Sequence, residues 1–383
     1  MRLALSGDRT VHLGYCYNVL PGETAAALID QVRRICGPVR ARLGVARLGV
    51  GLWIARPAAA ELIADAAARR ALAAALAAEG LYVFTLNGFP YGGFHAPRVK
   101  ARVFRPGWDD DARVAYTIDL ARILVELLPD DVARGSISTL PLGPADVDRA
   151  AARAGLRRAD DALAELEATT GRRVELAVEP EPGAGFERVD VMAPWLAEAD
   201  RGRAGRLGAC VDLCHAAVVD EAETAPFVAL AAAGVRCAKV QVSSALVVPR
   251  PDDDAARAAL AAFDEPRFLH QVRSSRGGAM DLPEALADLD RGVPWRVHFH
   301  VPVHRDVVGP GGAFATTAPT IAPMLAAALA APGEPPHLEV ETYTWGVLPE
   351  AERPRDDAGL CDGIARELAW TLGELAALGV HPS

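Results

Sequence analysis

The sequence predicts an α/β protein whose parallel strands close into a (β/α)8 barrel, the TIM-barrel fold. Short apolar runs with a period-2 pattern alternate with Ala-rich helical stretches along the whole chain. In five of these runs one face carries acids, histidines or amides, as expected for strands whose inner faces line a polar site. A barrel with extended loops reaches 383 residues, so we expect a single domain over residues 1–383.

Nine runs are predicted as strands, one more than a closed barrel needs. In order, they lie near residues 11–19, 46–55, 81–87, 135–141, 173–179, 207–213, 235–243, 296–303 and 337–343. Ala-, Leu- and charge-rich stretches between them predict helices near 23–35, 58–79, 109–128, 145–170, 190–201, 222–233, 254–263, 317–331 and 359–378. The extra strand or a hairpin falls between residues 235 and 303. It is 235–243, 296–303 or the shorter run 268–272, and the sequence leaves this open.

Segments rich in Gly and Pro follow three of the strand ends, at residues 87–95, 181–183 and 304–312. In a (β/α)8 barrel the loops after the strands form the active face. Residues 88–108 are long for such a loop and carry several aromatic side chains. We therefore predict that this segment, called the lid below, covers a site.

Composition excludes several classes of protein. The chain has a formal net charge of −10, with 50 acidic and 40 basic residues, which argues against nucleic-acid or anionic-membrane partners. Its apolar stretches are too short or too charged for a signal peptide or a membrane span, so we expect a soluble cytoplasmic protein. No phosphate-binding glycine motif opens a helix, so we expect no nucleotide cofactor. The six scattered cysteines are expected to be small buried side chains, with Cys210 and Cys214 lining the site.

Three carboxylates end predicted strands on their inward faces: Glu179, Asp212 and Glu341. At one mouth of a barrel they would repel each other unless a cation neutralised them. This predicts a divalent metal ion, Mn²⁺, Mg²⁺ or Zn²⁺. The candidates for the remaining ligand are Gln241, His270 and His300, and the residues alone do not choose among them.

Other polar residues on inward faces are candidates for substrate binding and catalysis. His215 lies three residues after Asp212 and would face a substrate oxygen, while His298 shares a face with His300. Lys239 is a candidate catalytic residue, although a buried ion pair is its simpler role. We also predict substrate contacts for His12, Asn18 and Asn87, and each of these residues has an alternative role in packing the barrel.

Several stretches of the chain resemble the EboE family of metabolite-traffic proteins. They are residues 12–23, 81–91, Leu-Ala-Val-Glu-Pro-Glu-Pro-Gly at 176–183, Asp-Leu-Cys-His at 212–215, and His-Leu-Glu-Val-Glu-Thr-Tyr-Thr-Trp at 337–345. EboE is similar to the xylose-isomerase-like TIM barrels, which include sugar isomerases, sugar epimerases and apurinic endonucleases. The resemblance implies a divalent metal at the carboxyl-terminal face, held by a Glu, an Asp, a His and a Glu.

Carried over to this chain, the ligands implied by the resemblance are Glu179, Asp212, a third position and Glu341. Spacing places Gln241 where the superfamily has His, whereas His300 has the expected residue type but occurs later in the chain.

The resemblance and the residues together predict a metal-dependent isomerase or epimerase for a small sugar- or polyol-like metabolite in a secondary-metabolite processing and traffic pathway. Glu179 or Glu341 would move the proton, and His215 would polarise a substrate oxygen. The alternatives are a metabolite-binding traffic protein without turnover and a metal-dependent phosphodiesterase. Expected partners are the metabolite, proteins of the same gene cluster and further copies of this chain.

Overall fold

Eight parallel strands form a closed barrel in the computed structural model, which describes residues 1–382. Each strand pairs with the next along the chain, and the last pairs with the first, Leu338 beside Leu13. This confirms the predicted (β/α)8 fold. The barrel strands are β2 (Arg9–Cys16), β3 (Leu48–Trp53), β4 (Leu81–Asn87), β5 (Arg134–Thr139), β6 (Arg173–Val178), β7 (Leu207–Asp212), β8 (Cys237–Val242) and β15 (His337–Val340).

Strand register arranges the polar interior in layers. Cys210 on β7 pairs with Lys239 on β8, and one layer further Asp212 pairs with Gln241. Gln241 in turn pairs with Glu339 on β15. Because paired residues of parallel strands face the same side, these side chains share the barrel interior. The carboxylate-bearing ends of β6, β7 and β15 consequently meet at one mouth of the barrel.

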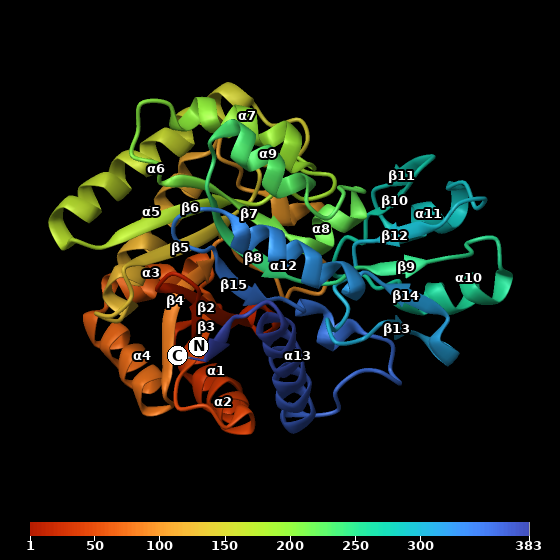
Figure 1. Cartoon of the computed structure of the whole chain (residues 1–383), viewed down its shortest axis with the longest axis horizontal. Helices are drawn as coiled ribbons and strands as arrows, with labels where there is room; N and C mark the ends of the chain where they lie inside the picture. The colour runs from red at the N-terminus through yellow and green to blue at the C-terminus, as the bar shows by residue number, and fades with distance from the viewer. Residues whose placement is uncertain (383) are drawn as a thin grey trace.

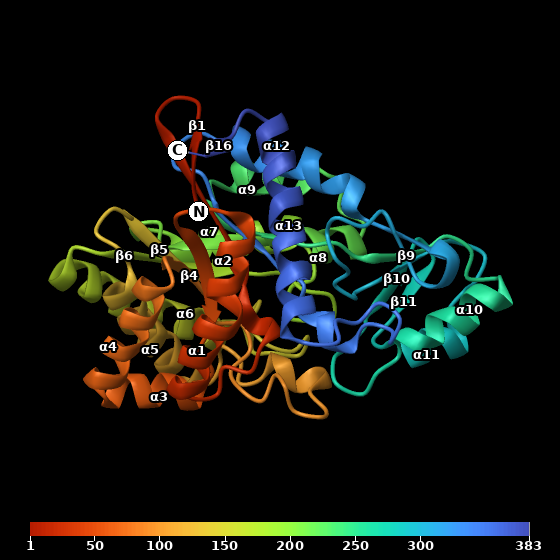
Figure 2. The ribbon, with the colours of Figure 1, turned by 90° about the horizontal axis from the view of Figure 1, so that it is seen from below.

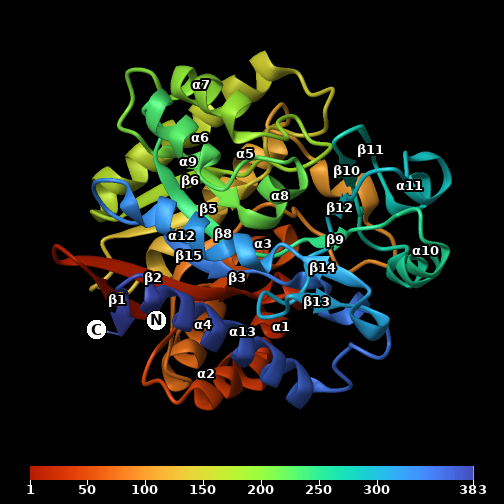
Figure 3. The ribbon, with the colours of Figure 1, turned by 45° about the vertical axis from the view of Figure 1, so that its right-hand side comes forward.

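Helices surround the barrel on the outside (Figures 1 and 3). Asp110 and Asp148 cap the fifth and sixth of them by accepting hydrogen bonds from backbone N–H groups of the first turn. The helices are α1 (Ala25–Gln31), α2 (Gly37–Leu43), α3 (Arg56–Ala64), α4 (Ala66–Ala78), α5 (Asp111–Leu127), α6 (Arg149–Thr170), α7 (Val189–Asp200), α8 (Leu213–Val218), α9 (Ala225–Ala233), α12 (Ile321–Ala330) and α13 (Asp357–Ala377).

A second, smaller sheet is inserted between β8 and α12 and projects from one side of the barrel (Figure 1). Its strand order is β11-β10-β12-β9-β14-β13. The elements of this insertion are β9 (Leu246–Val248), α10 (Asp254–Leu260), β10 (Val272–Ser274), β11 (Gly277–Ala279), α11 (Leu282–Asp288), β12 (Trp295–Val297), β13 (Val307–Val308) and β14 (Phe314–Thr316).

The insertion explains why the sequence predicts nine strands although the barrel has eight. Residues 235–243 supply the barrel strand β8, whereas only Trp295–Val297 of the run 296–303 is a strand, and it belongs to the small sheet. Residues 298–303 then follow an irregular path beside the end of β8, where the backbone N–H of Val301 donates to Ser244 O at 2.9 Å. The prediction of a strand over 296–303 is therefore wrong beyond Val297. Its period-2 pattern reflects burial on both sides of an irregular segment.

The two chain ends lie together outside the barrel (Figure 2). Strand β1 (Arg2–Leu5) pairs antiparallel with β2 on one side and with β16 (His381–Pro382) on the other. Within residues 1–382, no helix combines the length and the apolar character needed to cross a membrane.

Candidate active site

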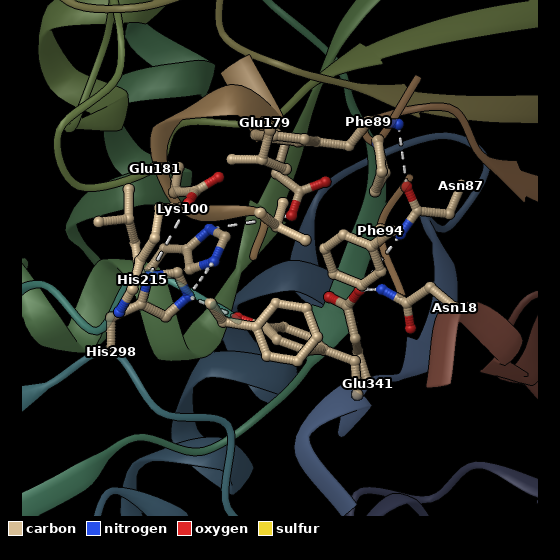
Figure 4. Close-up of a pocket in the computed structure, with 16 residues that line it drawn as sticks. Asn18, Asn87, Phe89, Phe94, Lys100, Glu179, Glu181, His215, His298 and Glu341 are labelled. Carbon is tan, nitrogen blue, oxygen red and sulfur yellow. Dashed lines mark hydrogen bonds and ion pairs between the residues drawn. The ribbon is translucent and has the colours of Figure 1, made fainter. Parts of the chain in front are cut away.

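A cavity lies at the mouth where the carboxyl-terminal ends of the strands meet (Figure 4). Its polar side chains come from strand ends and from the loops after them, and the lid and the insertion add apolar ones. The lining residues are Asn18, Asn87, Phe89, Pro90, Phe94, Val99, Lys100, Val103, Glu179, Glu181, His215, Phe268, Leu269, His298, Glu341 and Tyr343.

The three predicted carboxylates come together at this mouth. Glu179, Asp212 and Glu341 each offer an oxygen within 4.8 Å of the other two, and all three side chains are buried. Among the described residues, neither Glu179 Oε2 nor Asp212 Oδ2 has a hydrogen-bond partner. Burial and the neighbouring carboxylates raise the pKa of Glu179 and of Glu341 well above the usual range. These buried, unpaired oxygens fit a divalent cation.

Hydrogen bonds orient two of these carboxylates while leaving one oxygen of each available. Asn18 and Asn87 donate from Nδ2 to Glu341 Oε1, at 2.7 and 3.2 Å. Asp212 Oδ1 accepts the backbone N–H of His215 at 2.8 Å and the Ser243 hydroxyl at 2.9 Å. Such contacts fix the direction in which a carboxylate presents its other oxygen. The predicted residues Asn18 and Asn87 thus lie at the site, beside Glu341.

Two imidazoles face each other on the opposite side of the cavity (Figure 4). His215 Nδ1 lies 3.0 Å from Pro180 O, and His298 Nδ1 lies 2.6 Å from Gln271 Oε1. Both of these oxygens accept, so both Nδ1 atoms carry hydrogens, and the two Nε2 atoms meet at 3.1 Å. That contact is a hydrogen bond only when one ring holds a second proton. Burial lowers the pKa of both imidazoles, which opposes that protonation.

His300 offers a free imidazole lone pair next to the carboxylates. Its Nδ1 is 3.0 Å from Glu341 O, an acceptor, so Nε2 is the unprotonated nitrogen of the neutral ring. Burial lowers its pKa to about 4. Within the described part of the chain, His300 Nε2 has no hydrogen-bond partner. Ligand atoms of His300, Asp212 and His215 all lie within 4.8 Å of one another.

The two other candidates for the third ligand differ from His300. Both nitrogens of His270 are engaged, Nδ1 with His298 O at 3.0 Å and Nε2 with Glu265 Oε1 at 2.9 Å. His270 therefore supports the insertion. Gln241 is fully buried in the layer of Asp212, and its amide has no hydrogen-bond partner among residues 1–382.

Lys239 and His12 are also absent from the cavity lining. Lys239 is fully buried one layer below Gln241, where its ammonium contacts Glu339 Oε2 at 2.5 Å and Ser138 Oγ at 3.2 Å. The structure thus gives Lys239 the ion-pair role. His12 lies at the opposite, amino-terminal end of the barrel, with its Nδ1 3.0 Å from the Tyr82 hydroxyl. The prediction that His12 contacts substrate at the carboxyl-terminal mouth is therefore corrected. The strand pleat determines that the side chain points inward, but not how far along the barrel axis it lies.

Sequence reasoning missed other cavity residues. Glu181 lies 3.9 Å from His298, and burial raises the pKa of Glu181 to about 8. The sequence could have indicated Glu181, because it lies two residues after Glu179 in the Val-Glu-Pro-Glu motif at the end of β6. Tyr343 lies two residues after Glu341 in the last strand-end motif, whereas Phe268 carried no comparable signal, because its position depends on how the insertion folds.

Aromatic side chains form one wall of the cavity. The ring of Phe94 in the lid lies 4.9 Å from that of Phe268, and Phe268 is 4.9 Å from Tyr343. An ion pair of 2.6 Å between Lys100 and Asp281 joins the lid to the insertion. Residues 88–108 therefore cover the site, as predicted. Cys214 Sγ lies within 4.8 Å of nitrogens of His298 and His300.

Comparison with known proteins identifies the family. Residues 43–294, more than half of the chain, match the family described as "Xylose isomerase-like TIM barrel". The chain belongs to the xylose isomerase-like TIM barrel family. Among solved structures, it is similar to a xylose isomerase domain protein from Planctomyces limnophilus, with 14% identity over 96% of this chain and 97% of that chain and a TM-score of 0.50.

Two further solved structures are similar to the chain. One is a D-psicose 3-epimerase crystallised in the presence of D-fructose (11% identity, 95% of this chain, 99% of that chain, TM-score 0.50). The other is a xylose isomerase-like TIM barrel protein from Mycobacterium smegmatis in complex with magnesium (13% identity, 96% and 97%, TM-score 0.49). At these identities the likeness shows the fold alone. None of the curated proteins matches the chain.

Proposed function

We propose that this member of the xylose isomerase-like family is a divalent-metal-dependent isomerase or epimerase that acts on a small sugar- or polyol-like metabolite. The observation that carries the proposal is the convergence of Glu179, Asp212 and Glu341 at the mouth of the barrel. Within residues 1–382, two of their buried oxygens are without a partner.

Charge balance in the barrel interior supports a cation at this point. The carboxylates of Glu179, Asp212, Glu341 and Glu339 surround an interior whose ammonium group, on Lys239, is already paired with Glu339. Full ionisation of the other three would leave their negative charges buried and uncompensated, which is costly at low dielectric. A divalent ion would be held by Glu179, Asp212 and Glu341.

His300 supplies the fourth ligand in this proposal, because its Nε2 lone pair is buried and free among the described residues. Carboxylates with one imidazole suit Mn²⁺, Mg²⁺ or Zn²⁺. When bound, the ion supplies a Lewis acid that stabilises negative charge developing on substrate oxygens.

The side chains around the cavity are suited to moving a proton between neighbouring carbons of a hydroxy-carbonyl compound. Glu179 and Glu341 are the candidate bases, and a hydrogen bond of 2.7 Å from Asn18 holds Glu341 in place. His215 and His298 direct their Nε2 lone pairs at one point, where they would accept a hydrogen bond from a substrate hydroxyl group. The aromatic wall excludes water from the reacting carbons.

The cavity favours a neutral, hydroxylated substrate. Carboxylates, amides and imidazoles pair with hydroxyl groups, whereas an anionic phosphate would face Glu179, Glu181 and Glu341. The cationic lining residue Lys100 is already paired with Asp281. These features weigh against the phosphodiesterase alternative. A role in processing and traffic of a secondary metabolite, with partners from the same gene cluster, is supported by the resemblance of the strand-end motifs to the EboE family.

A second candidate function is metabolite binding without turnover, and the position of Gln241 favours it. Gln241 lies in the layer of Asp212, where a further barrel-borne ligand would lie, yet an amide binds divalent transition metals more weakly than an imidazole. A site with a weakened metal would still bind a polyol through the same carboxylates and amides.

Deuterium exchange tests the proposal. A panel of unphosphorylated ketoses and aldoses is incubated in D2O with the protein and Mn²⁺ or Mg²⁺, and exchange at the carbon next to the carbonyl is followed by NMR. We expect exchange with the wild type and its loss in Glu179→Gln and Glu341→Gln. Binding of a panel member without any exchange would replace the enzyme proposal with the binding-protein candidate.

A further inference from the structure

Glu367 is a buried carboxylate outside the cavity, in the middle of helix α13. We infer that Glu367 is a positioning residue that holds His300 and Glu341 in register for the metal site. This inference rests on the proposed function for the role of those two residues. Its structural basis is the set of contacts that Glu367 makes with three separate segments of the chain.

Four hydrogen-bond donors converge on the two oxygens of Glu367. Oε1 accepts the Thr342 hydroxyl at 2.6 Å and the backbone N–H of Val303 at 3.1 Å. Oε2 accepts the Tyr15 hydroxyl at 2.8 Å and Trp345 Nε1–H at 3.2 Å. The side chain is fully buried. Each oxygen therefore binds two donors, and one oxygen joins the return segment of the insertion to the loop after β15.

The two segments that meet at Oε1 carry the proposed ligands. Thr342 directly follows Glu341, and Val303 lies three residues after His300. Further contacts tie the same segments together, because His300 Nδ1 faces Glu341 O and the Thr344 hydroxyl donates to His300 O. Residues 298–303 are irregular, so these side-chain contacts replace the strand ladder that positions ligands elsewhere in the barrel.

The chemistry of the contacts requires a carboxylate at position 367. Four donors need four acceptor lone pairs, which an ionised carboxylate supplies. An amide of the same shape would place its NH2 group against two of the donors. A buried charge that served only packing would be dispensable, since an apolar residue of similar volume is often neutral or stabilising.

Metal affinity and backbone exchange in Glu367→Gln test the inference. The control is Asp160→Asn in α6, which also removes a buried carboxylate but lies outside the cavity and contacts Arg203. Mn²⁺ affinity is measured by titration calorimetry, and amide hydrogen exchange of residues 298–304 and 341–345 is measured on metal-free protein. We expect about 10- to 100-fold weaker Mn²⁺ binding and faster exchange of both segments in Glu367→Gln. Asp160→Asn should match the wild type in both measurements.

Two results would overturn the inference. One is unchanged exchange of both segments, and the other is faster exchange with unchanged Mn²⁺ affinity. If the wild type itself binds no Mn²⁺, the proposed metal site fails, while the exchange data still decide whether Glu367 holds the two segments. Should Glu367→Gln not fold, Thr342→Val removes a single donor at constant shape and is expected to weaken Mn²⁺ binding several-fold.

Discussion

Glu175 and Glu179 lie on or directly after the same strand, β6, and both are buried, yet their surroundings are opposite. Glu175 contacts three arginines, Arg134 at 3.2 Å, Arg173 at 3.2 Å and Arg236 at 3.1 Å. Glu179 has His215 at 3.8 Å, and among the described residues its Oε2 is without a hydrogen-bond partner.

The different surroundings of Glu175 and Glu179 distinguish a buried charge that stabilises the fold from one that is placed to bind a ligand. At the amino-terminal end of the barrel the protein supplies its own counter-charges and pairs its histidines, as in the contact of His337 Nδ1 with Ser136 Oγ at 2.8 Å. At the carboxyl-terminal mouth it buries carboxylates without cations of its own. Uncompensated buried charge costs stability, so such a site is expected where a ligand supplies the missing charge.

The largest expected effect comes from Asp212→Asn. The asparagine keeps the oxygen that caps α8 through the His215 N–H, so the fold should persist, but the charge facing the proposed cation is lost. We expect the deuterium-exchange rate to fall by about 10³-fold, in the range for removal of a group that stabilises charge in the reaction. Unaltered exchange in a folded variant would contradict the metal site.

Glu175→Gln should show the reverse pattern. Removing this charge leaves Arg134, Arg173 and Arg236 without their shared partner, so we expect a loss of about 3 kcal/mol of unfolding free energy. Metal affinity should stay at the wild-type value. Urea unfolding measured beside Glu179→Gln provides the matched control, because that variant should cost less than about 1 kcal/mol without metal. Equal losses of unfolding free energy in Glu175→Gln and Glu179→Gln would contradict the different roles assigned to these two carboxylates.

Sequence predicted the fold and the carboxylates for a physical reason. The period-2 pattern and strand-helix alternation are local, and residues at strand ends such as Glu179 and Asp212 inherit their place from the barrel. The same pattern does not show how far along the barrel axis an inward side chain lies. It therefore predicted a substrate contact for His12, which lies at the amino-terminal end of the barrel. It also could not give the contacts of Glu367 or Phe268, which depend on how the insertion packs across the mouth.

The stability that Glu181 contributes to the metal-free protein should fall as pH rises from 6.5 to 8. Burial raises the folded-state pKa of Glu181 to about 8, so the native state retains a proton that the unfolded chain releases above about pH 4.5. Stability linked to Glu181 is complete below its unfolded pKa and is lost as pH rises through its folded pKa. We expect the Tm of the wild type to fall by about 2–4 °C relative to that of Glu181→Gln over this window. A Tm difference between the two proteins that does not change with pH would contradict the assignment.

The smallest effect is expected for Gln241→Met. The buried amide is without a hydrogen-bond partner in the part of the chain that the structure describes, so an apolar side chain of similar length should change unfolding free energy by no more than about 1 kcal/mol. If His300 is the fourth ligand, Mn²⁺ affinity should remain within about threefold. His300→Gln is the comparison, with an expected loss of at least about tenfold. The opposite ranking of the two variants would assign the ligand to Gln241.

Elemental analysis of protein purified without chelator or nickel tests the central claim most directly, with the wild type, Glu175→Gln and Glu179→Gln side by side. Our account predicts close to one divalent metal ion per chain in the wild type and in Glu175→Gln. Glu179→Gln should be folded and nearly free of metal. Absence of metal from the wild type even after addition of Mn²⁺, Mg²⁺ or Zn²⁺, or equal metal content in Glu179→Gln, would contradict it.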